Sequence, residues 1–597
     1  MLLPGMLREA RPELEIGYFH HIPFPSYELF RILPERAEVL RGLLGADLVA
    51  FHTHDYMRHF ISTVERVLHL DFRLDEVQLG DRVVRVNALP MGINYDLYHG
   101  ASQKPEVRAA VERTRRLFGS HKLVLAVDRL DYSKGILHRL WGFAAFLEHH
   151  PEYRGQVTLA MVIVPSRDHV GSYAELKTRI DEEIGSINGK YSTMDWTPVC
   201  YFYHGFAFEE LAAMYCVADV ALVTPLRDGM NLVAKEYIAT KTDNPGVLIL
   251  SEMAGAAVEL SEALQINPND IGQIERSLVE ALTMPVGEQR RRIRDMQRTI
   301  CTQTVDKWAA DFLEELDATR RKNERLRRKR ISVGTTAAVR AAYGRAKRRL
   351  LLFDYDGTLA ALRPRPEDAA PTPELLDLLR RLSGDPANRV VINSGRDHET
   401  LERWFGSMPL SLAAEHGGFY KEAGVWHKNL RSAEWDGELL TLLQRFVAKT
   451  PRARLETKQT ALAWHYRQSD ACSRLRLQIM QGDKVVEIKS PDCTKGSEVE
   501  RLLAAERYDF ILALGDDTTD DDMFRALPPE AVTVKVGNVS ECAAHNLAAQ
   551  AEVLPFLREV TRGEAGPRTA ASEGRKGLRL PLGFLKGLLK NNKTRHE

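Results

Sequence analysis

Residues 350–360 read LLLFDYDGTLA, and this stretch decides how the second half of the chain is interpreted. Its apolar start predicts a buried strand, and two carboxylates, Asp354 and Asp356, follow directly where the strand ends. In open α/β sheets, ligands bind outside the carboxyl ends of the strands. Two carboxylates so close together repel each other, and a bound cation offsets that cost. Hard oxygen ligands of this kind suit Mg²⁺, so the stretch predicts a magnesium site.

Three further motifs follow at the ends of predicted strands or at a predicted helix start. RVVINSG ends a strand at Ser394, whose hydroxyl can bind a phosphate oxygen. The segment TKG at 494–496 places the cation Lys495 at a helix start, where positive charge suits phosphate. DFILALGDDTTD ends another strand in acids that include Asp516 and Asp520. Each motif alone is more often a turn or a helix cap, but all four in this order predict one phosphate-handling site.

Together these motifs resemble those of the haloacid dehalogenase-like phosphatases, which have an α/β Rossmannoid fold. The resemblance implies that Asp354 attacks phosphorus and that Asp356 protonates the leaving alkoxide and then activates water. It also implies that Ser394 and Lys495 hold the phosphoryl oxygens. Mg²⁺ would be held by the carboxylate of Asp354, the carbonyl of Asp356 and Asp516, with Asp520 or Asp517.

The stretch between Ser394 and Lys495 is long enough for an α/β cap domain, expected at about residues 400–485. It contains AAEHGGF (413–419) and LETKQTALAWHYR (455–467). These motifs resemble trehalose-6-phosphate phosphatases, in which a Glu-x-Lys pair and an Arg nine residues after that Lys grip the sugar. The substrate-binding residues that this implies are Glu456, Lys458 and Arg467, with Arg396, Glu487 and Lys489 added. Surface ion pairs on a cap sheet remain the alternative interpretation.

In the first half of the chain, short apolar runs alternate with amphipathic stretches, which predicts doubly wound α/β units. KLVLAVDRLDYSKGI (122–136) ends a strand and offers Arg129 and Lys134, two cations that suit a diphosphate. VTPLRDGMNLVAKEYIA (223–239) ends a strand at Asp228 and opens a helix with free backbone N–H groups. Glu236, about two turns further along, can accept hydrogen bonds from ribose hydroxyls.

Five segments of this half resemble trehalose-6-phosphate synthases, retaining glycosyltransferases of the two-Rossmann-domain (GT-B) type. They read HIPFPSYELFR, GADLVAFHTHDYMRHF, VDRLDYSKGI, INGKYSTMDWTPV and LVTPLRDGMNLVAKEY, and the likeness runs from Met1 to about residue 315. By this resemblance Arg129 and Lys134 bind the nucleotide diphosphate and Glu236 binds the ribose. The donor glucose, taken as that of UDP-glucose, would be bound by Asp228 and by the amides of Gly229, Met230, Asn231 and Leu232.

Two polar residues at other strand ends complete the expected synthase site. Taken alone, His21 is more often a structural loop residue and Arg167 a surface cation. By the same resemblance His21 contacts the donor sugar and Arg167 binds the phosphate of the acceptor, glucose 6-phosphate. Such enzymes transfer glucose without a metal.

The expected organisation is a partial first Rossmann domain at 1–105, a nucleotide-sugar-binding domain at 106–318, a basic linker at 319–348, the phosphatase at 349–562 and a basic, disordered tail at 563–597. Chains that it resembles begin well before this Met1, so the first domain is expected to be incomplete and to expose an apolar edge and face. A misplaced start or a fragment is preferred over an inactive synthase half, because the donor-site residues are intact.

The composition excludes several classes of protein. Lysine plus arginine equals aspartate plus glutamate, 82 each, so no net charge directs the chain to nucleic acid or an anionic membrane. No apolar run approaches the roughly 18 residues of a membrane span, and no signal peptide is predicted. The six cysteines are scattered, which favours reduced thiols and a cytoplasmic protein. The expected partners are sugar phosphates, and a homo-oligomer through the synthase half is allowed.

Two hypotheses of different classes remain. The leading one is a bifunctional enzyme that makes the phosphorylated disaccharide in one half and removes its phosphate in the other. The rival is a phosphatase that carries a catalytically inactive, synthase-like scaffold for binding sugar phosphates or partners. A sucrose-phosphate type of enzyme pair fits less well.

Overall fold

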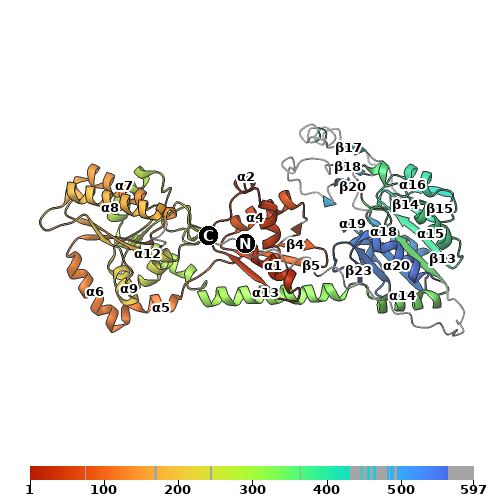
Figure 1. Ribbon diagram of the computed structural model, residues 1–597, viewed down its shortest axis with the longest axis horizontal. Coiled ribbons are helices and arrows are strands. Elements are labelled where there is room, and N and C mark those ends of the chain that lie inside the picture. The colour runs from red at the N-terminus through yellow and green to blue at the C-terminus, as the bar shows by residue number, and fades with distance from the viewer. Residues whose placement is uncertain are drawn as a thin grey trace, which may run out of the picture.

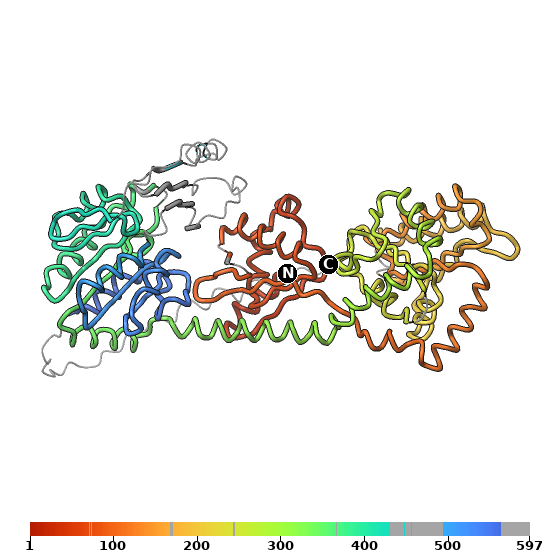
Figure 2. The backbone as a smooth tube through the Cα atoms, turned by 180° about the vertical axis from the view of Figure 1, so that it is seen from behind, coloured from red at the N-terminus to blue at the C-terminus, as the bar shows by residue number. Residues whose placement is uncertain are grey.

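The computed structural model describes residues 1–562, apart from residues 71, 74, 167–170, 243–244, 364, 458–460, 466–480, 483–484, 490–493 and nearly all of 430–453. Three α/β units lie in a row, and the unit formed by the N-terminal residues lies in the middle (Figure 1). The long helix α13 (Val305–Arg328) runs along this middle unit toward the third one, as Figure 2 shows from behind.

The first unit is a five-stranded sheet in the order β1-β2-β5-β4-β3. The strands β1, β2 and β5 are parallel, and β3 and β4 are added antiparallel. Its elements are α1 (Leu3–Ala10), β1 (Gly17–His20), α2 (Tyr27–Phe30), α3 (Arg36–Leu43), β2 (Leu48–Phe51), α4 (His54–Leu68), β3 (Phe72–Arg73), β4 (Glu76–Leu79) and β5 (Arg82–Ala88). Exposed apolar side chains lie in and around α1 and α2, at Met1, Leu3, Met6, Ile22, Leu29 and Ile32.

The second unit is a six-stranded, fully parallel sheet in the order β11-β10-β9-β6-β7-β8. The strand order reverses between β6 and β9, which makes this the switch point where doubly wound sheets bind ligands. Its elements are α5 (Tyr95–His99), α6 (Pro105–Phe118), β6 (Lys122–Arg129), α7 (Ile136–His149), β7 (Val157–Val164), α8 (Gly171–Tyr191), β8 (Val199–Phe202), α9 (Phe208–Val217), β9 (Val220–Val223), α10 (Leu232–Thr240), β10 (Val247–Ser251), β11 (Leu264–Ile266), α11 (Ile271–Thr283) and α12 (Val286–Ile300).

The third unit has an eight-stranded sheet in the order β16-β15-β14-β13-β12-β21-β22-β23. Its switch point lies at β12, whose neighbours are β13 and β21. Its elements are α14 (Val333–Arg345), β12 (Arg349–Phe353), α15 (Pro373–Ser383), β13 (Asn388–Asn393), α16 (His398–Phe405), β14 (Ser411–Ala414), β15 (Phe419–Glu422), β16 (Val425–Lys428), α18 (Lys495–Ala505), β21 (Phe510–Gly515), α19 (Thr518–Ala526), β22 (Val532–Val536), β23 (His545–Leu547) and α20 (Val553–Val560).

A separate four-stranded antiparallel sheet forms the cap, in the order β17-β18-β20-β19. Its strands are β17 (Arg454–Thr457), β18 (Ala461–His465), β19 (Gln481–Gly482) and β20 (Val485–Lys489). The predicted cap start at about residue 400 is therefore wrong, whereas the last cap strand ends at Lys489, near the predicted end at about 485. Residues 411–428 form β14 to β16 of the main sheet, because β14 pairs in parallel with β13. The alternation of a strand does not specify which sheet it joins.

The predicted linker at 319–348 is also corrected. Helix α13 passes through the expected boundary at 318, and its buried positions Leu316, Thr319, Asn323 and Leu326 recur every three or four residues. This spacing places them on one helix face, which packs on β5 and β2 of the first sheet. Helix α14 buries Val339 and Tyr343 in the third unit. The basic residues that suggested a linker lie mostly on the remaining faces of the packed helices α13 and α14.

The predicted tail at 563–597 lies outside the described residues. Among the described helices, none is both long enough and apolar enough to cross a membrane. The cysteines in the described part of the chain are free thiols, at Cys200, Cys216, Cys301 and Cys542.

Candidate active sites

A cluster of carboxylates lies at the switch point of the third sheet, where β12 and β21 end side by side. Asp354 follows β12, Asp516 follows β21, and Asp520 lies in the first turn of α19. One carboxylate oxygen of each residue lies within 4.8 Å of the others. The fold therefore brings together acids that the sequence analysis took from two separate motifs.

Lys495 begins α18 and inserts its ammonium into this cluster. Its Nζ donates to Oδ1 of Asp354 at 2.5 Å and to Oδ1 of Asp520 at 2.7 Å. Lys495 is 2% exposed and Asp354 is 4% exposed, so these ion pairs are shielded from water. The predicted nucleophile, Asp354, and the predicted phosphate-binding cation, Lys495, thus form an ion pair with each other.

The loop after β12 fixes Asp516 from the other side. The hydroxyl of Thr358 donates to Oδ1 of Asp516 at 3.0 Å. Gly357 has a φ of 83°, and a Cβ added there would lie 1.9 Å from Oδ2 of Asp516. Only glycine tolerates this conformation and this close approach together. The glycine of DYDGT therefore has a steric role at the site.

The electrostatics of the cluster fit a divalent cation. Burial raises the pKa of Asp354; the ammonium of Lys495 opposes this shift, and Asp520 adds to it. Burial likewise raises the pKa of Asp516 well above its usual value, and the charges of Asp354 and Asp520 raise it further. Three converging carboxylates thus face one ammonium, which leaves an excess of negative charge on hard oxygen ligands. Mg²⁺ prefers such ligands.

Asp356, the predicted acid and base, is held by Arg396 in a two-pronged ion pair. Nε of Arg396 lies 2.7 Å from Oδ2 and Nη2 lies 2.6 Å from Oδ1. The guanidinium lies 4.7 Å from the ring centre of Trp404 and 5.5 Å from that of Tyr355, within the range of cation–π contacts. Ser394, at the end of β13, is buried, and its hydroxyl accepts the N–H of Arg396 at 3.2 Å.

One contributor to this site was assigned to the wrong place by the sequence analysis. Residues 415–417, expected in the cap, form a turn at the end of β14 in which all three φ angles are positive, at 48°, 57° and 92°. The N–H of His416 donates to the carbonyl of Ser394 at 3.1 Å. A Cβ on Gly395 would lie 2.6 Å from Nε2 of His416. The paired glycines after His416 are a turn signal that favours this left-handed turn.

The cap residues are placed only in part. Glu456 lies on β17 and Glu487 on β20, and both are paired with Ala463 on β18, which lies between them. Lys489 ends β20 and pairs with Ala461. Lys458 and Arg467 lie outside the described residues. The register thus places Glu456 and Glu487 in one row across the cap sheet.

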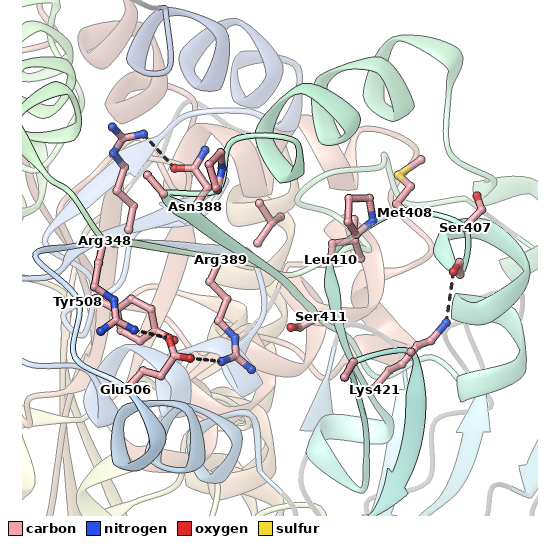
Figure 3. A pocket seen from close by; sticks show the side chains of 18 residues that line it. Arg348, Asn388, Arg389, Ser407, Met408, Leu410, Ser411, Lys421, Glu506 and Tyr508 are labelled. Carbon is pink, nitrogen blue, oxygen red and sulfur yellow. Dashed lines mark hydrogen bonds and ion pairs between the residues drawn. The ribbon is translucent and has the colours of Figure 1, made fainter.

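A groove of about 790 Å³ lies at the opposite, amino-terminal end of the third sheet (Figure 3). Its lining includes the first residues of β12, β13 and β14, together with several cations. Their ion pairs are Arg348–Glu506, Arg349–Asp385, Arg389–Glu422 and Lys421–Glu402. Because these pairs neutralise the groove and it lies away from Asp354, we place the chemistry at the other end of the sheet.

The second site lies at the switch point of the second sheet, between β6 and β9. Lys134 follows β6, Asp228 follows β9, and Nζ of Lys134 lies 2.6 Å from Oδ2 of Asp228. Asn231 donates to the same oxygen at 3.1 Å, and it caps α10 by accepting the N–H of Ala234 at 3.1 Å. The side chains of Lys134 and Asp228 are each 15% exposed, so solvent and a ligand can still reach them.

The first and second units meet at Gly229. A Cβ on this glycine would lie 2.0 Å from the carbonyl oxygen of His21 and 3.0 Å from Cδ2 of His52. His21 is exposed, whereas His52 is buried with its ring centre 5.5 Å from that of His21. No sequence pattern singled out His52, although FHTHDY contains it after a buried strand. The absence of a side chain at Gly229 therefore allows the two units to close on each other.

Glu236 lies in α10, where its carboxylate accepts the hydroxyl of Tyr215 at 2.9 Å. Burial raises the pKa of Glu236, and hydrogen bonds from Tyr215 and Tyr98 oppose the shift. Arg129 ends β6 and is exposed. The remaining predicted residues are placed as follows: Met230 is buried, Leu232 begins α10 and Arg167 lies outside the described residues.

Comparison with known proteins places both halves of the chain. Residues 1–318 match the model of glycosyltransferase family 20, and residues 352–553 match that of trehalose-phosphatase. The bifunctional trehalose-6-phosphate synthase/phosphatase of Thermoproteus tenax is 42% identical over 560 residues, which cover 90% of this chain and 76% of the relative. The alpha,alpha-trehalose-phosphate synthase (UDP-forming) B of Dictyostelium discoideum is 35% identical over 594 residues, which cover 94% and 75%.

Solved structures match the first half. The alpha,alpha-trehalose-phosphate synthase (UDP-forming) from Burkholderia vietnamiensis aligns with a TM-score of 0.52 and 36% identity, covering 53% of this chain and 72% of that one. The Escherichia coli protein bound with UDP-2-fluoro glucose aligns with a TM-score of 0.51 and 34% identity, covering 53% and 70%. These matches confirm the predicted two-Rossmann-domain fold of the first half, and the trehalose-phosphatase model at 352–553 supports the predicted phosphatase unit fused to it. The chain belongs to glycosyltransferase family 20 and carries a trehalose-phosphatase domain behind its glycosyltransferase half.

Proposed function

We propose that the chain transfers glucose from UDP-glucose to glucose 6-phosphate in its first half and hydrolyses the resulting trehalose 6-phosphate in its second half. The observation that carries the proposal is that one chain holds both assembled sites: Lys134 with Asp228 at one switch point, and Asp354 with Lys495 at the other. The relatives that resemble the chain over most of its length are named for the same pair of reactions or for the first of them.

In the phosphatase, Asp354 is the nucleophile. Its carboxylate oxygen attacks phosphorus, the bond from phosphorus to the sugar oxygen breaks, and an aspartyl-phosphate forms. The Lys495 ammonium, 2.5 Å from Oδ1 of Asp354, and the Ser394 hydroxyl would hold the phosphoryl oxygens as charge spreads over them. Burial of the nucleophile and the lysine keeps their interaction strong, because water does not screen it.

Asp356 would move the proton in both steps. Its carboxyl gives a proton to the leaving sugar oxygen, and its carboxylate then takes one from the water that attacks the aspartyl-phosphate. The ion pair with Arg396 binds the carboxylate form, which suits the second step. For the first step the carboxyl must carry a proton, so Arg396 has to release it when substrate enters. Arg396 is then available to contact the substrate.

Mg²⁺ would be held at the carboxylates that converge at the end of β12, namely Asp354, Asp516 and Asp520, with the backbone carbonyl of Asp356 as a further ligand. A bound Mg²⁺ would offset the negative charge of the carboxylates and of the transferring phosphoryl group. Glu456, Glu487 and Lys489 on the cap sheet would contact the disaccharide, together with Lys458 and Arg467.

In the synthase half, Lys134 and Arg129 would bind the diphosphate of the donor, and Glu236 its ribose. Asp228 and the amides of residues 229–232 would bind the donor glucose, where His21 also contacts it, and Arg167 would bind the phosphate of the acceptor. An inactive scaffold is the competing function. The assembled Lys134–Asp228–Asn231 group supports donor binding, and release of UDP distinguishes an active site from a scaffold that only binds sugar phosphates.

Two assays with matched variants test both halves. UDP release from UDP-glucose and glucose 6-phosphate measures the first, and phosphate release from trehalose 6-phosphate measures the second. Asp354→Asn is expected to abolish phosphate release and to leave UDP release unchanged, and Arg129→Ala is expected to do the reverse. Phosphate release that persists in Asp354→Asn would remove Asp354 as the nucleophile. If the unmodified chain releases no UDP but an N-terminally extended chain does, truncation is favoured; absence of UDP release from both chains would favour the scaffold.

A further inference from the structure

The first and third units contact each other through a small buried group, here called the joint, which consists of Val83, Leu326, Lys329, Val539 and Ser540. Three of these, Val83 on β5, Leu326 on α13 and Val539 after β22, form one apolar cluster and are 1%, 3% and 3% exposed. The N–H of Val539 also donates to the carbonyl of Gly80 in the turn between β4 and β5, at 3.1 Å. The three apolar residues of the joint are thus as well buried as the core of either unit, whereas Lys329 is half-buried.

Lys329 fastens the loop that carries Val539 and Ser540. Its Nζ donates to the carbonyls of Ser540, Glu541 and Ala543 at 3.0, 3.0 and 2.8 Å. Beside it, the N–H of Asn546 donates to the carbonyl of Lys329 at 2.8 Å, which adds the chain after α13 to the edge strand β23. Three bonds from one ammonium to the carbonyls of residues 540, 541 and 543 fix the conformation of that loop.

The same loop also contacts the first turn of α19, which contains Asp520 of the proposed Mg²⁺ site. The Ser540 hydroxyl donates to Oδ1 of Asp521 at 2.9 Å, and Nζ of Lys535 lies 3.0 Å from the same oxygen. Asp521 is 1% exposed and follows Asp520 in the first turn of α19. Asp520 in turn accepts the N–H of Asp517 at 2.9 Å through Oδ2 and the ammonium of Lys495 through Oδ1.

We infer that the joint positions the first turn of α19, so that docking of the glycosyltransferase half sets the Mg²⁺ affinity of the phosphatase half. Lys329 and Ser540 are the positioning residues. Lys329 orders the loop, and Ser540 orients Asp521, the neighbour of Asp520, through its hydrogen bond. This inference rests on the proposed Mg²⁺ site. Groups that orient metal ligands from outside typically change metal affinity by about 10- to 100-fold when they are removed.

The test uses the full chain, titrated calorimetrically with MgCl₂ alone. Lys329→Met keeps the length of the side chain and removes its hydrogen bonds, and Ser540→Ala removes only a hydroxyl. Each is expected to weaken Mg²⁺ binding about tenfold. Lys329→Arg keeps a cation at the joint and is expected to restore most of the affinity. Lys347→Met, a change of an exposed lysine in the same basic segment, is the matched control and is expected to bind like the unmodified chain.

Hydrogen exchange supplies a readout that does not depend on activity. In Lys329→Met, faster amide exchange is expected at 537–546 and also in the first turn of α19, with β12 unchanged. Exchange that rises only at 537–546, or Mg²⁺ affinity within twofold of the unmodified chain, overturns the inference. The failure of the proposed Mg²⁺ site looks different: the unmodified chain itself would bind no Mg²⁺, and Asp354→Asn would not alter the titration.

Discussion

Replacing Lys495 by Met tests whether this lysine is the internal counter-ion of the phosphatase site. The substitution keeps most of the side-chain volume and removes the ammonium, which pairs with Asp354 at 2.5 Å and with Asp520 at 2.7 Å. Because the two carboxylates are 4% and 0% exposed, water cannot take the place of the lysine. The variant therefore leaves two buried carboxylates unpaired.

The expected cost follows from the burial. Breaking a buried ion pair by removing one partner typically destabilises a protein by about 3–5 kcal/mol. For a domain of this size, each kcal/mol lowers the melting temperature by roughly 2–4 °C. We therefore expect the transition of the phosphatase unit to fall by about 6–20 °C in EDTA. The loss is expected to be smaller at acidic pH, where the Asp354 carboxyl, whose pKa burial raises, takes up a proton and loses its charge.

The response to Mg²⁺ distinguishes the loss of a counter-ion for buried carboxylates from a general packing defect. A cation that binds only the folded state at a hundred times its Kd adds about 2.7 kcal/mol of stability. Mg²⁺ is therefore expected to raise the melting temperature of Lys495→Met at least as much as that of the unmodified chain, while phosphate release stays lost. Lys235→Met is the matched control, since Lys235 is fully buried and pairs with Glu259 at 2.9 Å in the other half. It is expected to destabilise the glycosyltransferase half without any response to Mg²⁺.

Differential scanning calorimetry with and without Mg²⁺ measures all of these transitions. A drop of less than about 3 °C for Lys495→Met in EDTA, which corresponds to about 1 kcal/mol, would refute the argument that the lysine compensates buried charge. An equal Mg²⁺ response in Lys235→Met would show that the cation acts elsewhere.

Three further outcomes are expected. Gly357→Ala places a Cβ 1.9 Å from Oδ2 of Asp516, so phosphate release is expected to fall at least 100-fold with UDP release unchanged; near-normal turnover would contradict the steric role of this glycine. Gly229→Ala places a Cβ 2.0 Å from the carbonyl of His21 and is expected to abolish UDP release while phosphate release stays within twofold; UDP release near that of the unmodified chain would contradict the close contact of the two units at this glycine. Burial lowers the pKa of His20 to about 4 and that of His52 to about 3, from 6.5. The unfolded chain therefore binds these protons more readily, and stability is lost as pH falls below 6.5, by about 1.4 kcal/mol per group and pH unit; a melting temperature of the first unit that is equal at pH 7.5 and 5.5 would count against this.

Much of each site could be predicted because its chemistry is local. DYDGT, SG, TKG and GDDTTD each follow an apolar strand or open a helix, so their positions at strand ends follow from the chain itself. Parallel strands share one carboxyl edge, and this is why Asp354, Ser394 and Asp516 were expected in one crevice before any distance was known.

The pairings were decided by contacts between residues that are distant in the chain. Arg396 was predicted to bind substrate, yet its partner in the structure is Asp356, forty positions earlier. Residues 411–428 were expected in the cap and instead extend the main sheet, because the alternation of a strand is the same in either sheet. The basic stretch after residue 319 was expected to be a linker, but the buried positions of α13 pack on the first unit and those of α14 pack in the third.

The sequence by itself determined which chemical groups this protein carries and that each lies at a strand end, because a buried strand and the turn after it depend on neighbours along the chain. Only the tertiary structure decided which carboxylates converge on Lys495, which strands belong to the cap, and that the loop at 537–546 lies between the glycosyltransferase half and the first turn of α19. These features depend on hydrogen-bond partners and burial across long sequence separations, which no local pattern specifies.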